Sequence, residues 1–286
     1  MRIAILGTGK MGGAMAWRLN SAGHEMVLWN RTRERADALG IGKVAATPAD
    51  AAGGAEVVIS MLTDADAVRA AYLGEGGAVM AAQRQVFVEM STAGPDVARD
   101  IAPEIERAGA QFVEAPVMGS VGAVESGSLV VLAAGPDEAI ERALPVLEAL
   151  GQVRRVGDLG NAASLKLVAN SMTVGVSALA AEVQSAGAAA GLNPEDVFWV
   201  ITRIAPGLSA RKAGFVEHRY EPVTFALRDA VKDVRLATEL YARSGSITPL
   251  MNTTKELYER ANSSVGDLDI SAIASLYERQ TTDAKG

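Results

Sequence analysis

The sequence predicts an α/β protein: a doubly wound, mostly parallel sheet, followed by an all-α C-terminal domain joined to it by a long helix. Strand and helix patterns alternate up to about residue 155, which is typical of a parallel sheet covered on both faces. A glycine-rich turn follows the first strand. After Gly160 comes one small-residue-rich helical stretch, 161–191, and then mostly helical periodicity, with disorder expected only at 281–286. We therefore expect one domain over 1–160 and a second over 161–286.

The first strand, residues 2–6, leads directly into the glycine-rich turn and a helix over 11–20. In such a turn the first glycine permits a sharp bend, the second leaves room for a phosphate, and the third lets helix and strand pack closely. The helix start adds N–H groups and a positive dipole end. With a second strand at 26–29, this context predicts a Rossmann-type dinucleotide-binding unit. The turn residues expected to bind the cofactor are Gly7, Thr8, Gly9, Lys10, Met11 and Gly12.

The end of the second strand favours NADP (NADPH) over NAD as the cofactor. An acidic residue there would bind the ribose 2′-hydroxyl and repel a 2′-phosphate, but the sequence reads Asn30, Arg31, Thr32. Arg31 and Arg33 supply positive charge and planar donors, and Thr32 adds a hydroxyl. The alternative is a helix cap with solvated charges, and both interpretations can hold together.

Further strands are expected at 55–61, 85–90, 111–115 and 128–134, all continuing one sheet, with Asp64 capping the helix after the first of them. Ligands of open parallel sheets bind at the carboxyl ends of the strands. The loops at those ends should therefore converge, with the nicotinamide near Thr92. They contain Met61, Leu62, Ser91, Thr92, Met118, Gly119 and Ser120.

Composition narrows the class of protein. The chain has no cysteine, which excludes disulfides and thiolate metal sites, and two histidines alone do not form a metal cluster. A net charge of −7 argues against nucleic acid or an anionic membrane as the main partner. Met1 leads directly into the first strand, so we expect no signal peptide and a cytoplasmic location. The apolar stretch between Lys166 and Glu182 is too short to span a membrane, so a buried helix inside the helical domain or between subunits is expected.

Lys166 is the candidate proton donor. It lies near the start of the long helix, and Asn170 follows four residues later on the same face. Leu165, Leu167 and Val168 flank it, and an ammonium group in apolar surroundings exchanges a proton more readily near neutral pH. His24 and His218 are better explained as solvated side chains. An ordinary surface lysine is the alternative interpretation of Lys166.

Together these residues resemble the β-hydroxyacid dehydrogenases, the family of 3-hydroxyisobutyrate dehydrogenase. The resemblance covers almost the whole chain, and the end of the second strand is similar to the NADPH-dependent glyoxylate/succinic semialdehyde reductase branch. It is carried in order by the glycine-rich turn with its continuation to Ala16, Ser91-Thr92, Glu114-Ala115-Pro116-Val117, the Lys166/Asn170 pair, and Lys232-Asp233 with Phe225 ahead of it.

The resemblance implies a role for each residue. Lys166 would be the general acid for carbonyl reduction and the general base in reverse, and Asn170 would bind the substrate and hold Lys166. Thr92 would contact the ribose beside the nicotinamide, with Ser91 close by. The helical domain would contribute Lys232 toward the cofactor, Asp233 beside it, and Phe225 as a wall of the substrate pocket.

Three positions depart from the family pattern. Met118 stands where a serine of the substrate loop is usual, so either Ser120 substitutes for it or the substrate is less polar or bulkier. Ser171 replaces a second asparagine, and Ala162 replaces a glycine before the lysine. These departures leave the reaction class unchanged but weaken any named substrate.

We therefore predict an NADP(H)-dependent oxidoreductase that interconverts a small 3-hydroxyacid and its semialdehyde or keto acid, acting as a homodimer or higher homo-oligomer. One alternative is an imine reductase-like enzyme, which Met118 would suit, although such enzymes usually lack a lysine at the position of Lys166. The other is a non-catalytic nucleotide-binding scaffold on the same fold.

Overall fold

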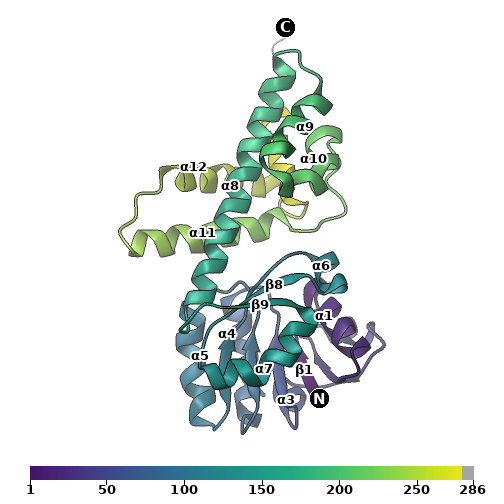
Figure 1. Cartoon of the computed structure of the whole chain (residues 1–286), viewed down its shortest axis with the longest axis vertical. Coiled ribbons are helices and arrows are strands. Elements are labelled where there is room, and N and C mark those ends of the chain that lie inside the picture. Colours follow the sequence, from purple (N-terminus) through teal and green to yellow (C-terminus); the bar gives the residue numbers. More distant parts are fainter. Residues whose placement is uncertain (279–286) are drawn as a thin grey trace. The chain divides into compact units, whose positions relative to one another are not determined.

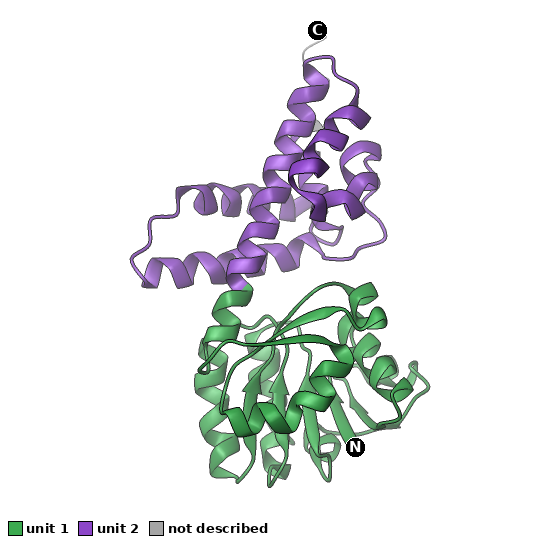
Figure 2. Ribbon diagram, viewed as in Figure 1, with its two compact units in different colours: residues 1–166 green, residues 167–286 purple. Residues whose placement is uncertain are grey.

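A computed structural model describes residues 1–278 of the chain; the disorder expected at 281–286 concerns residues outside this range. The described part divides into two compact units, residues 1–166 and the residues from 167 onward (Figure 2). The division falls inside the long helix, six residues after the boundary expected at 160/161. The start of that helix belongs to unit 1 because Ala162 packs with Leu132 and Ala134.

Unit 1 is built on a six-stranded parallel sheet in the order β3-β2-β1-β4-β5-β6. Its first strand, β1, is labelled in Figure 1. Its strands are β1 (Arg2–Leu6), β2 (Glu25–Trp29), β3 (Lys43–Val44), β4 (Val57–Ser60), β5 (Val86–Glu89) and β6 (Gln111–Glu114). The helices between them are α1 (Lys10–Ser21), α2 (Arg33–Asp37), α3 (Pro48–Ala52), α4 (Ala65–Leu73), the 3-10 helix η1 (Ala78–Ala81) and α5 (Asp96–Arg107). The strand order reverses between β1 and β4, which is where such sheets bind ligands.

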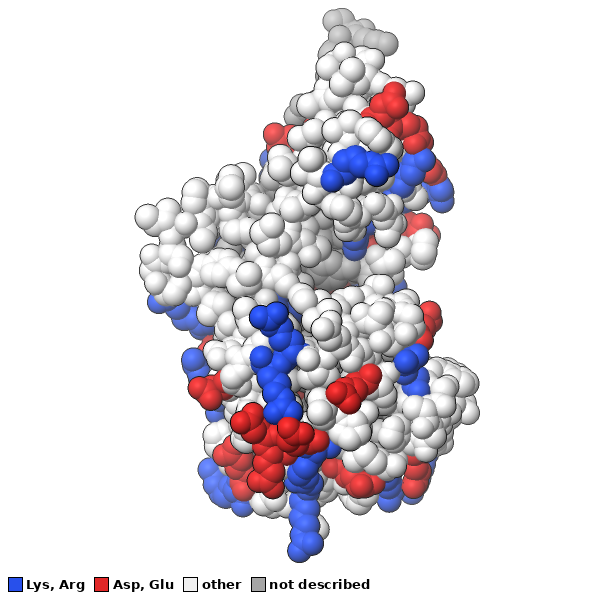
Figure 3. Space-filling view, viewed as in Figure 1, with Lys and Arg blue, Asp and Glu red and all other residues white. Residues whose placement is uncertain are grey.

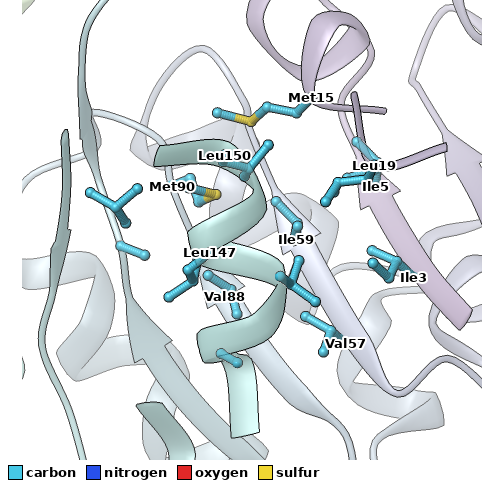
Figure 4. Packing of buried hydrophobic residues seen from close by; sticks show 14 of the residues in the cluster. Ile3, Ile5, Met15, Leu19, Val57, Ile59, Val88, Met90, Leu147 and Leu150 are labelled. Atoms are coloured by element: carbon cyan, nitrogen blue, oxygen red, sulfur yellow. The ribbon is translucent and has the colours of Figure 1, made fainter. Parts of the chain in front are cut away.

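Alternation along the strands explains the double winding. Ile3 and Ile5 of β1 belong to a core that includes α1 and α7 (Asp137–Leu150), whereas Ala4 and Leu6 belong to a core that includes α4 and α5. Figure 4 shows the first core, where side chains of α1 and α7 pack against strand residues. Both faces of the sheet are therefore buried, as predicted.

One strand prediction is wrong. The segment predicted at 128–134 does not continue the large sheet but forms β8 (Leu129–Ala133) of a separate sheet, with β7 (Val117–Met118) antiparallel and β9 (Gly151–Arg155) parallel to it. A single bridge between Glu114 and Ala134 joins the two sheets. The helix α6 (Val121–Ser126) connects β7 to β8. The two-residue strand β7 is too short to show a sequence pattern, so its antiparallel pairing with β8, and with it the separate sheet, was not predicted.

Unit 2 is helical, as expected. It contains most of α8 (Asn161–Ala189), then α9 (Pro194–Ile204), η2 (Pro206–Arg211), α10 (Lys212–Glu217), α11 (Leu227–Arg243), α12 (Pro249–Val265), η3 (Ile270–Ala274) and α13 (Ser275–Glu278). Its core gathers residues from α8, α9, α11 and α12 around the fully buried Tyr258, whose hydroxyl donates to the Val174 carbonyl at 3.2 Å.

The burial expected for α8 is incomplete. By length and composition alone α8 could cross a membrane, a test that core helices of soluble proteins also pass, and 33% of its most apolar window is buried. Val174 and Ala178 lie in the core of unit 2, whereas Met172 and Leu179 are 64% and 61% exposed. One face of α8 therefore packs inside the single chain, and the opposite face does not.

Candidate active site

Two glycines of the turn are required by packing. Gly7 has a φ of +101°, and a Cβ atom there would lie 2.3 Å from the carbonyl oxygen of Met61. A Cβ atom on Gly12 would lie 2.0 Å from the carbonyl oxygen of Gly7. Neither contact tolerates a side chain, so β1, β4 and the start of α1 approach one another only because these positions are glycine.

Gly9 is different, because nothing in the fold requires a glycine there. Its φ of −66° and ψ of −170° suit any residue, and a Cβ atom would meet nothing within 4 Å. The first turn of α1 contains no acidic residue, and no side chain caps it. Open space beside bare backbone at a helix start is the environment that a phosphate group needs. This turn therefore fits a dinucleotide pyrophosphate.

Asn30 holds the glycine-rich turn in place. Its Oδ1 atom accepts from the backbone N–H of Thr8 at 3.0 Å, and its Nδ2 atom donates to the carbonyl oxygen of Thr32 at 2.8 Å. Arg31 follows Asn30 as an exposed side chain, and Thr32 occupies the N-cap position of α2 without a side-chain cap bond. Arg33 pairs with Asp37 at 3.3 Å. Of the two arginines proposed for the 2′-phosphate, Arg33 thus already forms an ion pair within α2.

A buried polar network orders the loops after β4 and β5. Ser60 and Glu89 end these strands in register, and the Ser60 hydroxyl donates to Glu89 Oε2. Tyr72 Oη lies 2.8 Å from Ser60 Oγ, and the backbone N–H of Ser91 donates to Glu89 Oε1 at 2.6 Å. Ser91 Oγ in turn accepts from the N–H of Leu62 at 2.8 Å. Glu89 thereby ties together both loops predicted to border the nicotinamide, and burial raises its pKa to about 7.

Ser91 and its neighbours are placed accordingly. The Ser91 side chain is buried and holds the Leu62 backbone through its hydroxyl oxygen. Thr92, Met61 and Leu62 are partly exposed beside it. The sequence did not predict roles for Ser60, Tyr72 and Glu89. The one sequence feature that pointed to this network was Glu89, an acidic residue at the end of an otherwise apolar strand.

The predicted substrate loop is partly a packing element. Met118 pairs with Val130 in the small sheet and packs against a cluster that contains Leu132, Ala134 and Ala162. Two departures from the family pattern, Met118 and Ala162, thus belong to one cluster. Gly119 has a φ of +133° and no room for a Cβ atom, which would lie 2.7 Å from Leu129 Cδ2, and Ser120 is exposed.

Lys166 is the sixth residue of α8 and is partly exposed. The expectation that Leu165, Leu167 and Val168 surround its amine is wrong in part. Leu167 is buried, but Leu165 and Val168 are 43% and 46% exposed. Successive residues of a helix point about 100° apart, so neighbours in sequence do not enclose a side chain.

Three predicted residues of unit 2 meet around one carboxylate. Asn170 Nδ2 donates to Asp233 Oδ2 at 2.5 Å, and Lys232 Nζ lies 2.9 Å from Asp233 Oδ1. Asp233 is buried, with 3% of its side chain exposed. Asp233 therefore orients Asn170 through a hydrogen bond to Oδ2 and Lys232 through an ion pair with Oδ1.

Ser171 and Phe225 have defined surroundings as well. Ser171 Oγ donates to the Leu167 carbonyl at 2.8 Å and lies 2.9 Å from Tyr241 Oη, so this residue links α8 to α11. Phe225 packs on the core of unit 2, and its N–H donates to Asp269 Oδ2 at 3.2 Å. Asp269 also accepts from Thr224 and lies 3.3 Å from Arg211. Asp269 could not be recognised as this acceptor from the sequence, because its partners are distant along the chain.

Comparisons with known proteins identify the family. A family model described as the NAD binding domain of 6-phosphogluconate dehydrogenase matches residues 2–169, and one described as NAD-binding of NADP-dependent 3-hydroxyisobutyrate dehydrogenase matches 160–277. The chloroplastic glyoxylate/succinic semialdehyde reductase 2 of Arabidopsis thaliana is 34% identical over 95% of this chain and 78% of its own length.

Solved structures give the same result. The 3-hydroxyisobutyrate dehydrogenase of Salmonella typhimurium has a TM-score of 0.86 at 26% identity, covering 96% of this chain and 99% of that one. An imine reductase of Streptomyces aurantiacus has a TM-score of 0.64 at 27% identity, covering 97% and 100%. The chain is an NAD(P)-binding oxidoreductase that acts on hydroxyl or carbonyl groups, and it belongs to the β-hydroxyacid dehydrogenase family.

Proposed function

We propose that this protein is an NADPH-dependent reductase of small aldehyde or keto acids, reversible as a 3-hydroxyacid dehydrogenase, with Lys166 as the general acid and base. The observation that supports this most is the cluster of Asn170, Asp233 and Lys232, together with Lys166 one helical turn before Asn170. Three polar groups held together in this way, with a lysine one turn away on the same helix, are more than a helical scaffold needs.

The bound nicotinamide supplies or accepts the hydride. The residues of the chain handle the proton. The Lys166 ammonium gives one proton to the carbonyl oxygen as the carbon receives the hydride, and the resulting amine regains a proton from water. In the reverse direction the amine removes the hydroxyl proton. Asn170, fixed by Asp233, offers its remaining amide groups to the substrate.

The preference for NADPH follows from charge at the end of β2. No carboxylate stands at position 30, and the exposed Arg31 can bind a 2′-phosphate through two parallel hydrogen bonds. Asn30 contributes by fixing the turn through Thr8, and Thr32 can add its hydroxyl. NADH has no 2′-phosphate and would lose the contacts with Arg31 and Thr32, so it should bind more weakly but in the same way.

Two substrate classes fit the loop that contains Met118. The similarity to the Arabidopsis thaliana reductase favours a semialdehyde or glyoxylate. Met118 packs against apolar neighbours and offers no hydroxyl, and this favours a less polar substrate such as a cyclic imine, in line with the similarity to an imine reductase. Lys166 favours the first class, because carbonyl reduction requires proton transfer to oxygen.

The proposal includes a homodimer or larger homo-oligomer in which a second copy covers the exposed face of α8. Met172, Leu179 and Val183 are spaced by seven and four residues and lie on one face of the helix, and Gly175 between them leaves open space. Figure 3 shows few charges over the α8–α12 part of unit 2 on the visible face. Monomers rarely expose such a face, whereas subunit interfaces bury it.

A substrate panel tests the proposed activity. Glyoxylate, succinic semialdehyde, methylmalonate semialdehyde, 3-hydroxyacids, serine and cyclic imines would each be assayed with NADPH or NADP⁺ and with NADH or NAD⁺. Turnover of an aldehyde or keto acid with NADPH supports the proposal. Turnover of imines alone favours the alternative enzyme class. Tight NADPH binding without turnover of any substrate would favour a scaffold.

A further inference from the structure

The helix that carries Lys166 begins at a position that cannot cap itself. Gly160 precedes α8 with a φ of +95° and has no side chain, and the first turn of α8 contains no acidic residue. The first N–H groups of any helix lack partners within the helix and need acceptors from elsewhere. A serine or aspartate at the N-cap position is the usual acceptor. Here the acceptor must come from another part of the chain.

Glu114, the last residue of β6, supplies that acceptor. Its Oε2 atom accepts from the backbone N–H of Gly160 at 2.8 Å, and the N–H groups of Ala162 and Ala163 also favour the charged carboxylate. Only 3% of Glu114 is exposed. Burial raises its pKa, and these three N–H groups act in the opposite direction. A carboxylate 46 residues away in sequence thus closes the start of α8.

Other contacts fix the first turn of α8 to the rest of unit 1. Ala162 is fully buried in the cluster that contains Met118, and Asn161 Nδ2 donates to the Val156 carbonyl at 3.1 Å. Lys166 lies one helical turn after Ala162. The backbone that carries the lysine is therefore anchored to the end of β6, in register with Glu89 on β5, which orders the two loops predicted to border the nicotinamide.

We propose that Glu114 is a positioning residue for catalysis: by accepting the N–H of Gly160 at the start of α8 it holds Lys166 at a fixed place relative to the strand ends that carry the cofactor loops. This inference rests on the proposed role of Lys166. A buried carboxylate would be an expensive way to stabilise a helix that a local cap could stabilise. The Glu114 carboxylate also links the sheet to the helix that carries Lys166. This link matters for catalysis, because a small displacement of a general acid slows proton transfer to the substrate.

Glu114→Gln is the test variant. Glutamine has the same shape, but it is neutral, and its amide nitrogen is a donor where the carboxylate has a second acceptor oxygen, so it stabilises the N–H groups of this turn less well. Thr47→Ala is the matched control, because Thr47 caps α3 in the same unit by accepting from Asp50 N at 3.0 Å and belongs to no proposed site. The measurements are kcat and its solvent deuterium isotope effect, the dissociation constant of NADPH, and hydrogen exchange of amides 160–166.

We expect Glu114→Gln to lower kcat by about 10- to 100-fold, to raise the solvent isotope effect and to speed exchange at 160–166, while NADPH affinity changes less than about twofold. Thr47→Ala should change none of these. An unchanged kcat and isotope effect in Glu114→Gln, alongside a strong loss in Lys166→Ala, would overturn the positioning role alone. Full activity of Lys166→Ala would instead overturn the proposed function, whatever Glu114→Gln does.

Discussion

Glu89 predicts an unusual dependence of stability on pH. Burial raises its pKa from 4.5 to about 7. The unfolded chain therefore releases this proton at lower pH than the folded protein, and the contribution of Glu89 to folding falls as pH rises toward 7. Each tenfold change in an acid constant corresponds to about 1.4 kcal/mol. Between pH 5 and pH 8 this one carboxyl should therefore cost the folded protein about 2 kcal/mol.

Glu89→Gln removes this cost at neutral pH. The amide copies the neutral acid: its oxygen can accept from Ser91 N–H, and its nitrogen can donate to Ser60 Oγ, which can turn toward Tyr72. The difference in unfolding free energy between Glu89→Gln and the unaltered protein should shift in favour of the variant by about 2 kcal/mol from pH 5 to pH 8.

Urea unfolding followed by tryptophan fluorescence measures this difference. Trp17 and Trp29 lie in unit 1 and Trp199 in unit 2, so a Trp199→Phe background reports on unit 1 alone. Glu138→Gln, at an exposed position of α7, controls for the loss of one negative charge. A difference for Glu89→Gln that stays constant across this pH range would refute the raised pKa and the buried network behind it.

Three further predictions concern the cofactor, the substrate loop and the oligomer. Arg31→Ala should raise the KM for NADPH about tenfold or more and leave that for NADH nearly unchanged, whereas Arg33→Ala, already paired within α2, should have a smaller effect; equal losses with both cofactors would place the phosphate elsewhere. Met118→Ser should increase kcat/KM on carboxylate substrates and cost about 1–3 kcal/mol of stability through lost packing; unchanged steady-state kinetics would remove this loop from acid recognition. Leu179→Glu should convert the oligomer to a monomer in light scattering at micromolar concentration, while Met80→Glu, an exposed methionine of unit 1, should not; a monomeric unaltered protein would rule out the interface.

The fold was predictable where local chemistry decides it. The glycine-rich turn, the alternating strands and helices, and the long helix are each predicted by a local pattern of residues in the sequence. The prediction that β8 continues the large sheet failed because β7, which pairs with it, has only two residues. Its other partner, β9, lies farther along the chain, and such pairing leaves no local sequence pattern. The exposed face of α8 could not be predicted either, since an apolar helix looks the same whether its own chain or another covers it.

The sequence suggests candidate site residues one by one, but not the contacts between them. Asn170, Lys232 and Asp233 were chosen separately, and the structure joins them through one carboxylate. Glu89 and Glu114 were not assigned roles, because their importance arises from register between parallel strands, which places both acids at the same sheet edge. Sequence spacing contains no direct record of that register.

Loss of the Lys166 amine tests the central proposal most directly. Lys166→Ala would be assayed by single-turnover oxidation of NADPH with the best substrate of the panel, alongside NADPH binding by fluorescence. The proposed role predicts a rate reduced by about 10²- to 10⁴-fold with cofactor affinity nearly intact. A variant that binds NADPH normally and oxidises it at the original rate would contradict the assignment of Lys166 as the acid.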